Sequence, residues 1–67
     1  MIQLLVNGQP QHLDATISVS ELLRNMGLEG KRLAIDRNGE IVPRSKFDEQ
    51  MLIDGDRLEI VTAIGGG

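Results

Sequence analysis

The sequence predicts an α+β fold in which a mixed sheet of four to five strands wraps across one helix. Three observations lead to this prediction. Several short segments alternate apolar and polar residues, as half-buried strands do. Asn7-Gly8 and Asn38-Gly39 follow two of these segments, and Asn-Gly pairs favour tight hairpin turns. A single segment, between the two hairpins, carries apolar residues at helical spacing, so we expect its apolar stripe to cover the sheet.

The first hairpin occupies the beginning of the chain. Ile2, Leu4 and Val6 share one face of its leading strand, which is typical of a strand with one side buried. The strand that returns from the turn contains Pro10, whose nitrogen has no hydrogen to donate to a neighbouring strand. We therefore expect the returning strand at an edge of the sheet, with the lone histidine, His12, solvated on it.

One helix is expected to follow this hairpin. Ser18 and Glu21 have the spacing of a capping box, in which the serine hydroxyl accepts a hydrogen bond from the glutamate backbone amide. Gly27 provides a residue that easily adopts the left-handed conformation at a helix end. The apolar residues between these two signals recur at helical spacing and form one stripe: Val19, Leu22, Leu23 and Met26.

The second half of the chain predicts three further strands. A strand over 32–37 and a short return over 40–42 flank the second Asn-Gly turn, and Phe47 is expected to point inward from a helical turn. Asp54-Gly55-Asp56 is typical of a tight turn. The last strand, over 57–64, is the most continuously apolar. We therefore place it centrally beside the first strand, with the two hairpins outside.

Length and composition exclude several classes of function. Sixty-seven residues make one domain, expected over 1–64, with a flexible glycine tail over 65–67. The net charge of −3 argues against nucleic-acid binding and favours a basic surface on a protein partner. Without cysteine there is neither a disulfide nor a thiolate zinc site. No apolar run is long enough for a membrane span and no signal peptide is visible, so we expect a cytoplasmic protein without membrane contact.

The end of the sequence suggests where the chemistry takes place. The strand-forming run Ile60-Val61-Thr62 leads towards Gly65, Gly66 and Gly67. A segment without side chains enters a narrow slot in which any Cβ would clash. Its terminal carboxylate, ionised at neutral pH, then reaches a reagent held by another protein. We hypothesise that Gly67 is the reactive residue. The opposing interpretation is an inert linker, because glycine-rich segments are often only that.

These features together resemble the ThiS family of ubiquitin-like β-grasp sulfur carriers, over the whole chain. The resemblance is carried by segments spread along the sequence, from Val6-Asn7-Gly8, Ser20-Glu21-Leu22-Leu23 and Leu33-Ala34-Ile35 to Ile41-Val42-Pro43-Arg44, Asp54-Gly55-Asp56 and Glu59-Ile60-Val61 before the glycines. The chain departs from the family at Phe47, where tryptophan is frequent, and at Gly65, an additional glycine before the usual pair. An aromatic anchor and the diglycine end are both retained.

The resemblance implies a carrier that is a substrate of other enzymes and has no catalytic residue of its own. An E1-like adenylyltransferase would use ATP and magnesium to adenylate the carboxylate of Gly67. A sulfurtransferase and cysteine desulfurase system would then form a thiocarboxylate, and thiazole synthase would accept the sulfur into the thiazole ring of thiamine. The carrier itself would bind no cofactor and would be monomeric when free. Because the chain has no cysteine, its terminus is the group left to carry sulfur.

A docking surface for the activating enzyme is expected on the face of the sheet that points away from the helix. The alternation of the two central strands places Leu5, Val61 and Ala63 on this face, and a register shift of one residue would turn them inward. His12 is interpreted as a solvated strand residue and not as a general base or metal ligand, because no second ligand lies at motif spacing. We assign no metal site.

Three alternatives stay open at this point. The chain also fits the small subunit of molybdopterin synthase, a related sulfur carrier. It also fits a non-catalytic β-grasp interaction module with an inert tail, or a ubiquitin-like modifier that is joined to lysines. An independent enzyme is the least favoured interpretation, because no set of residues in the sequence forms a catalytic constellation.

Overall fold

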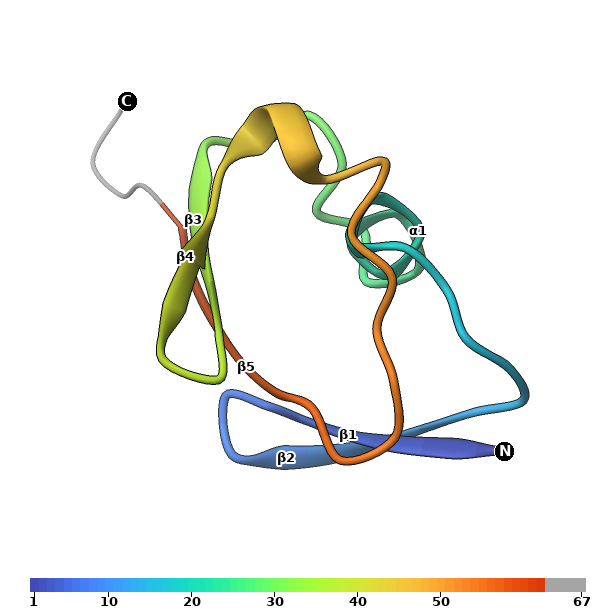
Figure 1. Cartoon of the computed structure of the whole chain (residues 1–67). Coiled ribbons are helices and arrows are strands. Elements are labelled where there is room, and N and C mark those ends of the chain that lie inside the picture. The colour runs from blue at the N-terminus through green and yellow to red at the C-terminus, as the bar shows by residue number, and fades with distance from the viewer. Residues whose placement is uncertain (63–67) are drawn as a thin grey trace.

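The computed structural model describes residues 1–62, and the predicted tail and Ala63 lie outside this range. It contains a five-stranded sheet, one α-helix and one 3₁₀ turn (Figure 1). The elements follow in the order β1 (Ile2–Val6), β2 (Gln9–Leu13), α1 (Val19–Asn25), β3 (Leu33–Arg37), β4 (Glu40–Val42), η1 (Arg44–Lys46) and β5 (Arg57–Thr62). The predicted fold class, a mixed sheet across one helix, is confirmed.

The strands lie in the order β2-β1-β5-β3-β4, so the last strand is central and the two hairpins lie outside it, as predicted. β5 is parallel to β1, with Leu5 opposite Arg57, and antiparallel to β3, with Ile35 opposite Ile60. Pro10 lies on the edge strand β2. β1, β5 and β3 each have a neighbour on both sides, whereas the proline-containing β2 and the three-residue β4 lie at the edges.

Helix α1 lies across one face of the curved sheet (Figure 1). Its apolar stripe meets the inward residues of the strands, which alternate with outward residues as expected for a half-buried sheet. Phe47 is buried just after η1, as predicted. Among residues 1–62, the core consists of eleven buried apolar residues: Leu4, Val6, Val19, Leu22, Leu23, Ile35, Val42, Phe47, Leu52, Leu58 and Ile60.

Both predicted ends of the helix are confirmed. The hydroxyl oxygen of Ser18 accepts a hydrogen bond from the backbone amide of Glu21 at 3.1 Å, and Gly27 has a φ of +74°. The expectation that Met26 belongs to the buried stripe is wrong. The helix ends at Asn25, so Met26 falls on the cap and its side chain is 37% exposed. Gly27 turns the chain away before a further helical position can face the sheet.

Within the part of the chain that the structure describes, no helix has the length and apolar character needed to cross a membrane.

Candidate functional site

The candidate site is the end of β5 and the sheet surface around it, because this strand leads to the predicted reactive terminus. β5 is described as far as Thr62, which lies opposite Leu33 of β3. The predicted reactive residue Gly67 and the other tail residues, Gly65 and Gly66, lie outside the described residues, as does Ala63. The structure therefore describes the strand that precedes the tail, as far as Thr62.

Asn7 binds the backbone of β5 close to the end of the strand that precedes the tail. Its side-chain oxygen Oδ1 accepts a hydrogen bond from the Ile60 amide at 2.7 Å, and its Nδ2 donates to the Ile60 carbonyl at 3.2 Å. The backbone amide of Asn7 also donates to the Leu58 carbonyl at 2.9 Å. Strand β1 has already ended at Val6, so the carboxamide of Asn7 replaces the next residue of the strand.

Asn38 binds the other end of β5 from the opposite side. Its Oδ1 accepts from the amide of Arg57 at 2.9 Å, and its backbone amide donates to the carbonyl of Arg57 at 2.8 Å. Asn7 and Asn38 both have a φ of 52° and both precede glycine with positive φ, which is the geometry predicted for Asn-Gly hairpin turns. The sequence predicted the two turns, but the contacts of the two side chains with β5 were missed.

The structure places Leu5 and Val61 on the face of the sheet away from the helix, because their neighbours along each strand are buried. Val61 is 64% exposed, whereas Leu5 is only half-buried. Leu5 lies opposite Arg57, four positions before Val61 on β5, which is a separation of about 13 Å along the strand. The two residues share a face, but they do not form one cluster.

Two apolar residues that the sequence reasoning missed lie closer to Val61. Ala34 of β3 is directly opposite it, and Ile41 of β4, which is 68% exposed, lies on the same face opposite Asp36. We call Ala34, Ile41 and Val61 the outer patch. Exposed apolar residues that cluster on a sheet face are typical of interaction surfaces. Only the pairing of three strands reveals the patch, because Val61 lies 20 positions after Ile41 in the sequence.

Two carboxylates lie beside the outer patch. Asp36 and Glu59 are directly opposite each other on β3 and β5, on the same outward face. The Oδ1 atom of Asp36 accepts a hydrogen bond from the Gly39 amide at 2.8 Å, so its side chain is tied to the turn. Like charges opposite each other on neighbouring strands are unfavourable. The exposed face thus combines apolar side chains with two carboxylates and, at Arg57 on the same face of β5, one guanidinium group.

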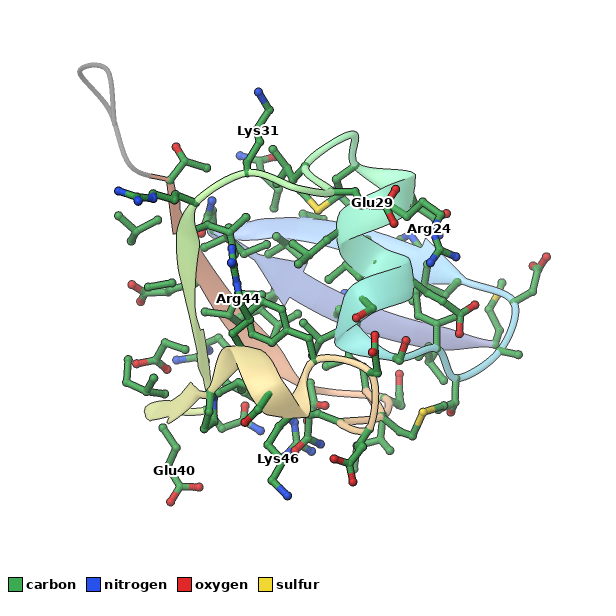
Figure 2. All side chains as sticks on the ribbon, turned by 90° about the horizontal axis from the view of Figure 1, so that it is seen from above. Arg24, Glu29, Lys31, Glu40, Arg44 and Lys46 are labelled. Atoms are coloured by element: carbon green, nitrogen blue, oxygen red, sulfur yellow. The ribbon has the colours of Figure 1, made fainter. Side chains whose placement is uncertain are left out.

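The helix side of the molecule has a different character. Arg24 and Glu29 form an ion pair at 3.2 Å beside α1, and their labelled side chains lie close together there (Figure 2). The side chain of Glu40 points away from the ribbon (Figure 2) and pairs along the sheet with Arg37, on the inward register. Arg24, Glu29 and Glu40 are exposed and Arg37 is partly buried, and Glu40 directly precedes Ile41 of the outer patch.

Asp56, predicted only as a turn residue, is buried where β5 begins. Burial raises the pKa of its carboxyl, but the hydrogen bonds from Arg37, from the Ile53 amide and from Asn38 outweigh this, so that the pKa lies below its ordinary value. The carboxylate is therefore ionised at neutral pH and fixes the start of the strand. His12 lies exposed on β2. Among residues 1–62, no three His, Cys, Asp or Glu side chains gather to hold a metal ion.

The chain matches the model of the ThiS family over residues 4–67, a range that includes the three terminal glycines. Among solved structures, it is similar to the crystal structure of the thiamine biosynthesis protein ThiS from Geobacter metallireducens. The TM-score is 0.83, the sequence identity is 33%, and the match covers 98% of this chain and 100% of that one.

Curated relatives include both short proteins and much longer ones. The sulfur carrier protein ThiS of Escherichia coli is 32% identical over 98% of this chain and 100% of its own length. The thiazole synthase of Paramagnetospirillum magneticum is 41% identical over 98% of this chain, but this chain spans only about a fifth of that relative, since 20% of its length is covered. A segment like this chain thus occurs both alone and within a longer protein.

Proposed function

Because this chain belongs to the ThiS family of small sulfur carriers, we propose that it carries sulfur as a thiocarboxylate on Gly67 for the thiazole ring of thiamine. The observation that carries the proposal is the family match, which extends through Gly65 and Gly66 to the terminal residue. The absence of cysteine from the whole sequence supports it, because no side-chain thiol can take the place of the terminus.

The proposed chemistry has three steps, and partners supply every reagent. The carboxylate of Gly67 attacks the α-phosphorus of ATP, with pyrophosphate as the leaving group, in an E1-like enzyme that binds ATP and magnesium. The terminal sulfur of a persulfide, formed by a cysteine desulfurase and sulfurtransferase system, then displaces AMP from the acyl carbon. A thiol of that system reduces the acyl disulfide, which releases the thiocarboxylate. The carrier contributes the acyl group and the surface by which enzymes hold it.

We assign the docking of the activating enzyme to the outward sheet face. The outer patch supports this role because Val61 lies on the strand that leads to the tail, one position before the last described residue. Leu5 and Ala63, the other two predicted docking residues, extend the surface in our proposal. The net charge of −3 favours a partner with a basic surface and gives no support for nucleic acid.

We also propose thiazole synthase as the partner that accepts the sulfur. The similarity of this chain to one segment of a protein named thiazole synthase supports this, because fusion of two domains is one way to keep interacting partners together. We propose that all of these reactions take place in the cytoplasm, where reducing conditions keep persulfides and thiols available.

Mass spectrometry tests the proposed function. The purified chain is incubated with an E1-like activating enzyme, ATP, magnesium and a persulfide source, and its mass is measured at intervals. Exchange of one oxygen for sulfur adds about 16 Da, and fragmentation should place the addition on Gly67. A chain whose Gly67 carboxylate is amidated is the control and should stay unmodified. No mass gain under conditions that convert the Escherichia coli relative would contradict the proposal and favour an interaction module.

A further inference from the structure

We propose that Asn7 is a positioning residue for the terminal chemistry, because among residues 1–62 it provides the last side-chain contact that holds β5 on the β1 side. This inference rests on the proposed function. It goes beyond it by assigning a role to a turn residue that is far from Gly67 in sequence. The role is to fix where the tail leaves the domain, and so where a docked enzyme finds the carboxylate.

The hydrogen bonds along β5 show how the side chain takes over from the strand. The ladder between β1 and β5 runs from the Leu5 amide, which donates to Asp56, to the Asn7 amide, which donates to Leu58. The next backbone groups that face β1 belong to Ile60. Both are satisfied by one carboxamide, which accepts at 2.7 Å and donates at 3.2 Å. Asn7 thus extends the sheet by one step without extending the strand.

Beyond Ile60 the support of β5 becomes one-sided. Val61 and Thr62 are opposite Ala34 and Leu33 of β3, while β1 has ended, so the described part of β5 has a strand only on its β3 side here. The five residues after Thr62 span at most about 17 Å when extended. Fraying β5 back by two residues would change that reach by about 7 Å. This is a large error for a carboxylate that must meet a bound nucleotide.

Asn38 provides a matched control within the same molecule. Its turn has the same Asn-Gly sequence and the same φ of 52°, and its carboxamide also binds the backbone of β5. It acts at Arg57, where β5 begins, and it additionally donates to the buried carboxylate of Asp56 at 3.0 Å. Loss of Asn38 should therefore cost at least as much stability as loss of Asn7, while it leaves the tail end of β5 in place.

The experiment compares Asn7→Gly with Asn38→Gly in the full chain. Glycine adopts positive φ without strain, so each variant keeps its turn and loses only the carboxamide. We expect Asn7→Gly to lower the kcat of the activating enzyme for thiocarboxylation about tenfold, measured at saturating concentrations of the variant chain. With Asn38→Gly the kcat should stay within about twofold of the value with the wild type. Asn7→Asp retains the acceptor for Ile60 but loses the donor, and it should be intermediate. Amide hydrogen exchange at Ile60 should accelerate in Asn7→Gly alone.

Each outcome decides for or against the role. Equal loss of kcat in the two glycine variants would show a general stability effect and overturn it. Wild-type kcat in Asn7→Gly would overturn it as well. If Asn7→Gly does not fold, Asn7→Asp decides, and unchanged exchange at Ile60 with unchanged kcat would count against the role. Failure of the wild type to gain sulfur would instead overturn the proposed function, and the role of Asn7 with it.

Discussion

The guanidinium group of Arg37 lies 2.9 Å from the buried carboxylate of Asp56, and this pair fixes the start of the strand that leads to the chain end. The same carboxylate accepts hydrogen bonds from the Ile53 amide at 2.9 Å and from Asn38 at 3.0 Å. It therefore ties the turn before β5 to the β3-β4 hairpin. A buried charge with several donors stabilises a fold only as long as it stays ionised and fully bonded.

Asn in place of Asp56 is expected to lower the free energy of unfolding by about 2–3 kcal/mol at pH 7. All of its donors lose a charged acceptor, and one of its two oxygens becomes an amide nitrogen that cannot accept. The folded pKa of Asp56 lies below its ordinary value of 3.8, so the stabilisation is complete above that pH. It declines as the pH falls below about 4, through the folded pKa, and the difference between variant and wild type should shrink with it. Urea unfolding between pH 7 and pH 3 measures this.

The control for this prediction is Asn in place of Asp14, an exposed residue. It should change stability by less than about 0.5 kcal/mol across the same pH range. A difference between wild type and Asp56→Asn that grows towards low pH would show that the sign of the pKa shift is wrong.

Val61→Asp tests the proposed docking surface. Val61 is 64% exposed, so the substitution should cost no more than about 1 kcal/mol of stability. Within the outer patch, a carboxylate without a partner should raise the KM of the activating enzyme for this chain about tenfold. The kinetic constants of adenylation, followed by pyrophosphate release, provide the measurement. Ile53→Asp is the matched control, because Ile53 is 54% exposed and lies outside the sheet, and its KM should be unchanged.

The acidic pair on the outward face leads to a prediction about stability. Replacing Asp36 with Asn and Glu59 with Gln removes the repulsion of two carboxylates that face each other across β3 and β5. Asn keeps an oxygen for the bond from Gly39. We expect the double variant to be more stable than the wild type by about 0.2–1 kcal/mol at low salt, and the gain to shrink as salt screens the pair. Thermal unfolding at two salt concentrations checks both parts, and a destabilised double variant would contradict it.

The elements of this fold could be predicted because their signals are local. Ser18 and Gly27 mark the helix ends within a few residues, and the two Asn-Gly turns need nothing beyond their own backbone. The buried stripe was overextended to Met26 because periodicity alone does not say where a helix stops.

The contacts at the candidate site could not be predicted, because they join distant parts of the chain. Asn7 reaches Ile60 across 53 positions, and Asn38 reaches Arg57 across 19. The outer patch likewise depends on the register of three strands. Alternation shows which face of the sheet a residue lies on, but a shift of the register by two residues would leave the alternation unchanged. The Asn-Gly sequence predicts a turn at Asn7 and at Asn38. The hydrogen-bond partner of each side chain on β5 follows only from the order of the strands.

Substitution within the tail tests why its residues are glycines. If the terminus enters a narrow slot in the activating enzyme, a side chain should interfere more the nearer it lies to the carboxylate. We expect Gly66→Val to lower kcat/KM for adenylation at least tenfold, on the order expected when the reacting group is displaced by an ångström, and Gly65→Val to have a smaller effect. Both variants should unfold within about 0.5 kcal/mol of the wild type. Equal activity of Gly66→Val and the wild type would show that the tail meets no narrow slot, and would leave the terminal carboxylate as its one chemical requirement.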